Sequence, residues 1–97
     1  MVIITEISYP PESSKEMVKR FAERPALPDF MTAKGPYFSS EKGEGIQALT
    51  IYEFDQAKLS DAIQFAAKGM VIYYGVPGFT YSVKPWIDVQ EGMKLIS

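Results

Sequence analysis

The residues of this chain that could do chemistry are carboxylates, lysines, hydroxyls and aromatic rings, because it contains no cysteine and no histidine. Without cysteine there is no disulfide framework, thiolate nucleophile, iron–sulfur ligand or zinc–thiolate site. Without histidine there is no imidazole base, proximal haem ligand or Ser-His-Asp triad. Glu41 and Glu44 suggest a cation site, yet calcium takes about six to eight oxygen ligands. We therefore expect neither a metal nor another cofactor.

The candidate ligand-binding residues are polar and aromatic side chains spread over three predicted strands. They are Glu6, Thr50, Tyr52, Ser82, Lys84 and Trp86. Pockets for small molecules combine an apolar lining with a few convergent polar groups. The two rings would contact an apolar ligand, and Lys84 would meet its anionic or enolate end. In the alternative interpretation, Tyr52 and Trp86 pack in a subunit interface while Lys84 extends its charge into solvent.

The elements that position these residues follow the order strand, helix, strand, strand, helix, strand. Strands are predicted where β-branched and aromatic residues gather between turn residues, and helices where apolar residues recur every three or four positions. The predicted strands are Val2–Tyr9, Thr32–Ser40, Ile46–Phe54 and Phe79–Val89, and the predicted helices are Glu12–Arg24 and the stretch from Leu59 to Tyr73.

Local signals predict how these helices begin and end. Ser13 with Glu16 matches a capping box, and Asp55 is a typical N-cap for the second helix. Gly69 costs about 1 kcal/mol relative to alanine, so we expect the second helix to loosen there. Glu91–Ser97 is expected to form a short tail of mixed character.

The order of elements predicts a ferredoxin-like fold. Right-handed crossovers place the first and third strands in the centre of the sheet and the second and fourth at its edges. Pro36 and Pro85 fall in the two edge strands, where a missing hydrogen-bond donor is tolerated. We therefore predict one α+β domain over residues 1–97, βαββαβ, with a four-stranded antiparallel sheet and two helices on one face.

The sheet face opposite the helices is expected to be partly apolar. Ile3, Ile7, Leu49, Ile51, Phe79, Tyr81 and Val83 are assigned to the helix side. The opposite face is assigned Ile4, Glu6, Ser8, Ala48, Thr50, Tyr52, Phe54, Ser82, Lys84 and Trp86. An exposed face of this kind marks an interface, and the simplest cover is a second copy of the same sheet.

This layout resembles the dimeric α+β barrel superfamily, in which two ferredoxin-like protomers enclose a lumen. The resemblance covers Val2–Val89 and rests on element order and face pattern. Haem-using and chlorite-degrading members rely on a histidine that this chain lacks. Cofactor-free monooxygenases of the superfamily often use His, Asn or Trp, of which Trp86 is present here. The chain looks most like the small stress-related or uncharacterised members.

The amino-acid composition argues against two classes of binding partner. Ten Lys and Arg against twelve Asp and Glu give a net charge of −2, which argues against nucleic-acid binding and a polybasic membrane anchor. Alternating charges from Glu12 to Arg24 indicate a salt-bridged outer helix face. No stretch resembles a secretory signal or the roughly 20 apolar residues of a membrane span, so a cytoplasmic location is expected.

Three functions remain open from the sequence. The leading interpretation is a homodimer that holds a small apolar or amphipathic ligand between its sheets. The alternative is a cofactor-independent monooxygenase or isomerase for an aromatic or enolisable compound, with Tyr52 or Glu6 moving the proton. The third is an interaction domain whose sheet edges pair with a partner strand, which Pro36 and Pro85 disfavour.

Overall fold

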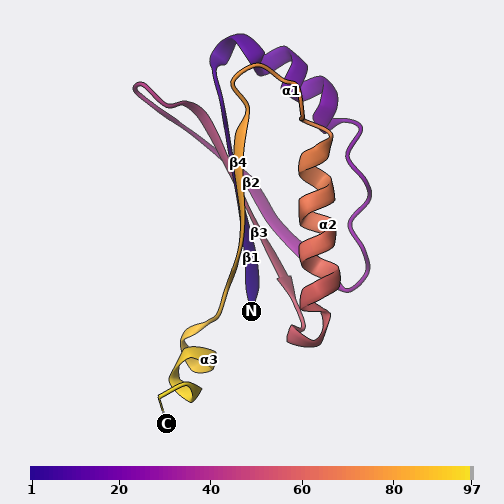
Figure 1. Cartoon of the computed structure of the whole chain (residues 1–97), viewed down its shortest axis with the longest axis vertical. Helices are drawn as coiled ribbons and strands as arrows, with labels where there is room; N and C mark the ends of the chain where they lie inside the picture. The colour runs from indigo at the N-terminus through magenta and orange to yellow at the C-terminus, as the bar shows by residue number, and fades with distance from the viewer. Residues whose placement is uncertain (97) are drawn as a thin grey trace.

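The computed structural model describes residues 1–96 and consists of a sheet layer and a helix layer (Figure 1). The strands are β1 (Val2–Tyr9), β2 (Met31–Glu41), β3 (Gly45–Phe54) and β4 (Thr80–Trp86). The helices are α1 (Ser14–Phe21), α2 (Leu59–Val71) and α3 (Val89–Lys94), with short 3-10 turns η1 (Pro11–Ser13) and η2 (Gln56–Lys58).

The sheet has the predicted ferredoxin-like topology. Its four antiparallel strands lie in the order β2-β3-β1-β4, so β1 and β3 are central and the proline-containing strands are edges. The β2–β3 register shifts between Lys34 and Tyr37, around a cis Gly35–Pro36 bond. Gly35 has φ of +103°, and a Cβ there would lie 2.8 Å from the Leu49 carbonyl oxygen, so this irregularity requires glycine.

The helices α1 and α2 cover one face of the sheet (Figure 1). Ile3 of β1 is fully buried in a cluster with Ala62 and Ala66 of α2. A second cluster joins Tyr9 at the other end of β1 to Met17 of α1 and to side chains from the end of α2 onward. The small alanines let α2 approach the sheet closely at one end, and larger side chains fill the other.

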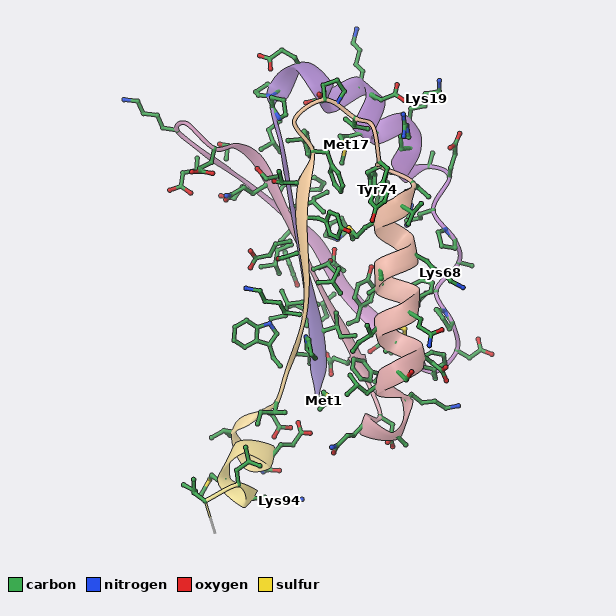
Figure 2. All side chains as sticks on the ribbon, viewed as in Figure 1. Met1, Met17, Lys19, Lys68, Tyr74 and Lys94 are labelled. Atoms are coloured by element: carbon green, nitrogen blue, oxygen red, sulfur yellow. The ribbon has the colours of Figure 1, made fainter. Side chains whose placement is uncertain are left out.

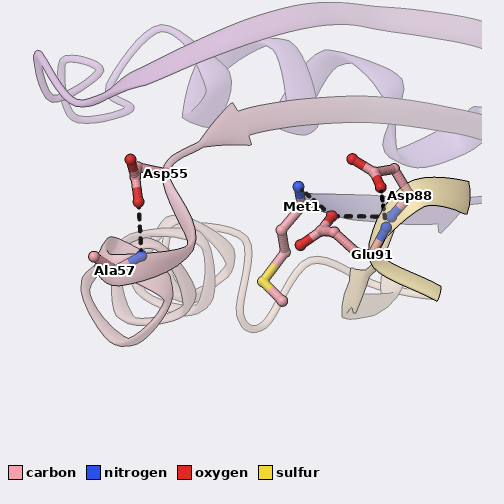
Figure 3. Close-up of polar contacts among 5 residues, drawn as sticks. All are labelled: Met1, Asp55, Ala57, Asp88 and Glu91. Carbon is pink, nitrogen blue, oxygen red and sulfur yellow. Dashed lines mark hydrogen bonds and ion pairs between the residues drawn. The ribbon is translucent and has the colours of Figure 1, made fainter. Parts of the chain in front are cut away.

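The helix ends agree only in part with the sequence-based predictions. The Asp55 carboxylate accepts a hydrogen bond from the Ala57 N–H at 2.9 Å, so Asp55 caps the 3-10 turn η2 that leads into α2, whereas the N-cap of α2 itself is Lys58 (Figure 3). The capping box at Ser13 is wrong, because Ser13 lies in a 3-10 turn and its Oγ donates to the Pro77 carbonyl at 2.6 Å. The first helix ends at Phe21 rather than Arg24, whereas α2 runs through Gly69 without interruption.

The segment Glu91–Ser97, predicted to be a short tail of mixed character, contributes to the helix α3 as far as Lys94, and Ser97 lies outside the described residues. Asp88 and Glu91 make a reciprocal capping box, with bonds of 2.7 and 3.0 Å, and the Met1 ammonium lies 2.8 Å from the Glu91 carboxylate (Figure 3). The helix stands at one end of the sheet, away from α1 and α2 (Figure 1). No helix within residues 1–96 has the length and hydrophobicity needed to cross a bilayer.

The register of β3 corrects the predicted assignment of its faces. Ile3 lies opposite Tyr52, and Thr5 lies opposite Thr50. Because Ile3 and Thr5 face the helices, their partners on β3 do too. The residues moved to the helix side are Ala48, Thr50, Tyr52 and Phe54, and those moved to the open side are Leu49 and Ile51. The assignments on β1 and β4 agree with the register.

Candidate functional site

The structure separates the predicted ligand-binding residues into two groups. Thr50 and Tyr52 face the helix layer, whereas the others lie on the opposite face of the sheet. Glu6 pairs with Ser82 across β1 and β4, while Lys84 and Trp86 pair with Ile4 and Val2. No single site can therefore hold all of these side chains.

A cavity of about 550 Å³ lies between the sheet and the helix layer. Thr5 and Thr50 contribute to its floor from the central strands, and Ala66 and Gly69 line it from α2. It opens toward residues 24–27 and the β2 edge, where Leu27 and Phe38 are exposed. Its size is within the roughly 300–1,000 Å³ typical of small-ligand pockets.

Aromatic rings form much of the cavity wall. Tyr52 and Phe65 meet edge to face, with ring centroids 6.2 Å apart and an angle of 86° between their planes. Tyr73 is buried at the end of α2 and stacks obliquely on Phe79, at 5.4 Å. Rings held in this way offer rigid apolar surfaces to a planar ligand.

Hydroxyl groups supply the neutral polar part of the lining. They belong to Thr5, Tyr9, Thr50, Tyr52 and Tyr73. In the part of the chain that the structure describes, no side-chain hydrogen bond engages any of these hydroxyls. Burial raises the pKa of Tyr52 and of Tyr73, against a smaller lowering by Arg24. These phenols therefore carry their protons at neutral pH and can donate hydrogen bonds to a ligand.

Arg24 is the one charged side chain of residues 1–96 that lines the cavity. Its guanidinium carbon lies 3.9 Å from the centre of the Phe21 ring, and its Nη1 donates to the Phe21 carbonyl at 3.1 Å. The sequence had suggested a place for Arg24 on the salt-bridged outer face of the first helix. Only Arg20 behaves in that way, with its Nε 2.8 Å from the Glu16 carboxylate.

Two exposed lysines of the helix layer point away from the cavity. Figure 2 shows Lys19 and Lys68 on the outer surface, whereas Met17 lies between α1 and the sheet. Arg20 also donates to the carbonyls of Ile72 and Tyr74, which fixes α1 against the end of α2. The cavity is therefore bounded by a helix pair held in place by hydrogen bonds as well as by packing.

The open face of the sheet consists of four cross-strand rows. In order across β2, β3, β1 and β4, they are Thr32–Glu53–Val2–Trp86, Lys34–Ile51–Ile4–Lys84, Tyr37–Leu49–Glu6–Ser82 and Ser39–Gln47–Ser8–Thr80. Apolar side chains thus occupy the middle of the face and a fully polar row closes one end. Trp86 is 51% exposed. The face is half polar, as predicted, although Leu49 and Ile51 replace the residues first assigned to β3.

No protein-family model matches this sequence, and no curated protein was found to match it. The geometry of the cavity and of the open face is therefore the basis for assigning a function.

Proposed function

We propose that the protein is a homodimer that binds a small amphipathic molecule in the cavity between the sheet and the helices of each protomer. The observation that carries this proposal is the lining itself, which combines aromatic walls, unengaged hydroxyls and one cation. The proposed site thus lies inside the protomer, instead of in the lumen between two sheets.

The open face of the sheet supports the proposed homodimer. Ile4, Leu49 and Ile51 form its apolar centre, and no helix of residues 1–96 covers that centre (Figure 1). Glu6 pairs with Ser82 of β4, and Lys84 lies two residues further along β4 on the same face. Neither Glu6 nor Lys84 has an ion-pair partner among the described residues. If two copies pack face to face about a two-fold axis that passes between these residues, Glu6 of each copy faces Lys84 of the other. The charges of the face then complement those of a second copy.

Binding is favoured over catalysis because only one of the two alternative proton-transfer residues lines the cavity, and that residue is a phenol. Tyr52 lines the cavity, whereas Glu6 lies on the other face of the sheet. Burial raises the pKa of the Tyr52 phenol, so the group stays protonated at neutral pH and can donate a hydrogen bond but does not supply a free base. Among residues 1–96, the cavity lining has hydrogen-bond donors for a ligand but no carboxylate or imidazole that could accept a proton from it.

Equilibrium dialysis with 2-naphthamide, a neutral planar amphipathic compound, tests the proposal. We expect saturable binding of one molecule per protomer. Ala66→Leu should abolish it, because Ala66 is buried and lines the cavity. Ala67→Leu is the matched control, since this neighbouring residue of α2 is exposed and should leave binding unchanged.

Thermal unfolding shows whether the Ala66 variant still folds. Thr50→Leu places the same bulk on the floor of the cavity from β3 and provides a second, independent block. Absence of saturable binding to the unmodified protein would contradict the proposal. So would undiminished binding to both blocked variants.

A further inference from the structure

Arg24 lines the cavity and makes few hydrogen bonds to other groups of the described residues. A guanidinium carries five N–H donors, and in the described residues the one bond from Arg24 is that from Nη1 to the Phe21 carbonyl. No carboxylate lies within ion-pair distance of it among residues 1–96. Packing over the Phe21 ring holds the planar group in one orientation. The guanidinium of Arg24 is therefore held in one orientation, and most of its N–H donors have no acceptor among the described residues.

The positive charge of Arg24 acts on two phenol groups of the cavity lining. Burial raises the pKa of Tyr52 and Tyr73, and in both cases the positive charge of Arg24 acts against that rise. Arg24 itself is exposed, as are the neighbouring residues that line the cavity opening. The guanidinium thus lies at the opening, close enough to the two phenols to affect their ionisation.

The electrostatic character of the cavity is that of an anion site. Its lining contains one cation, no acidic residue among residues 1–96, and several hydroxyls that can donate hydrogen bonds. A guanidinium pairs with a carboxylate through two parallel hydrogen bonds, which a neutral group of the same size cannot reproduce. The edge-to-face pair of Tyr52 and Phe65 provides the apolar surface for a ring.

We propose that the cavity selects planar aromatic carboxylates, with the carboxylate paired to Arg24 at the opening and the ring against Tyr52 and Phe65. This inference rests on the proposed function and adds the chemical class of the ligand. It also assigns the specificity to Arg24 and to no other cation of the helix layer.

The test compares 2-naphthoate with 2-naphthamide, which has the same ring system and a neutral head group. We expect the unmodified protein to bind the anion about tenfold more tightly, equivalent to about 1.4 kcal/mol. Arg24→Gln should remove this preference, measured as the ratio of the dissociation constants of the two compounds within the same variant. Arg24→Lys should retain part of it, because an ammonium keeps the charge without the bidentate geometry.

Lys19→Gln is the matched control, since it removes an equal charge from the outer surface of α1 and should leave the preference intact (Figure 2). Equal affinity for the two compounds, or a preference that survives Arg24→Gln, would overturn the inference and leave the proposed function standing. Binding of neither compound would overturn both.

Discussion

Ile3 of β1 lies directly opposite Tyr52 of β3, and both side chains pack beneath α2. Ile3 is fully buried there, while the Tyr52 ring continues outward to meet Phe65. One cross-strand pair therefore joins the tightest part of the core to the wall of the cavity. The shape of the cavity depends on the packing that stabilises the sheet against the helices.

Truncating Ile3 should destabilise the protein strongly. Ile3→Ala removes a fully buried side chain, and such substitutions cost about 2–5 kcal/mol of unfolding free energy. Urea denaturation measures the change. The control is Ile4→Ala, which removes the same atoms from the open face, where Ile4 is only half buried. If Ile4→Ala lowered the unfolding free energy as much as Ile3→Ala at low protein concentration, the two faces of β1 would be wrongly assigned.

Replacing Gly69 by alanine should stabilise the protein. Gly69 lies in the uninterrupted helix α2, and a Cβ placed there meets no atom within 4 Å. The substitution removes the helical penalty of glycine, so we expect a gain of up to about 1 kcal/mol. For a chain of this size that corresponds to a rise in melting temperature of about 4–8 °C. A lower melting temperature would mean that α2 is strained or broken at this position.

Charge reversal on the open face should control dimerisation. Glu6→Lys or Lys84→Glu alone places like charges across a two-fold interface, and we expect each to weaken self-association roughly tenfold. The double variant should recover the original affinity. Light scattering over a dilution series measures the molar mass of each.

Mixing the two single variants provides the internal control for this experiment. The Glu6→Lys variant has lysine at both positions, and the Lys84→Glu variant has glutamate at both. The mixed dimer should therefore form more tightly than either homodimer. A monomeric unmodified protein would contradict the proposed dimer, and a dimer insensitive to every charge change would place its interface elsewhere.

The elements and their order were predictable because each rests on local chemistry. Pro36 and Pro85 marked the edge strands by removing backbone donors, and Asp55 marked the start of a helix through its side-chain acceptor. Asp88 and Glu91 together are another local signal for the start of a helix. Their spacing matches a capping box, and it would have predicted α3 had it been interpreted in that way.

The faces of β3 could not be predicted because both sets of its alternating residues are partly apolar. A strand has a period of two, so moving its register by one residue exchanges every side chain between the faces. Thr50 and Leu49 are both half buried in the structure, which shows how little the two faces differ. The cavity cation was missed for a similar reason, since Arg24 continues the helical spacing of Arg20 although α1 has already ended.

Alkaline pH should destabilise the protein through its buried tyrosines. Burial raises the pKa of Tyr52 above its ordinary value of 10.0, so the folded state disfavours the phenolate more than the unfolded state does. The associated stability is present below about pH 10 and is lost as pH rises through the folded-state pKa. Tyr52→Phe should reduce this loss, with a remainder from Tyr9 and Tyr73. Urea unfolding at pH 8 and pH 10.5 compares the two proteins, and an identical loss in both would contradict the burial of Tyr52.

The most direct test of the ligand-binding cavity is to locate bound 2-naphthamide by nuclear Overhauser contacts between its ring protons and the methyl groups of the protein. We predict contacts to Ala48, Ala66 and Met70, whose side chains line the cavity between the sheet and the helices. Contacts to Ile4, Leu49 and Ile51 instead would place the ligand on the open face, between the sheets of a dimer, and would contradict binding in the cavity.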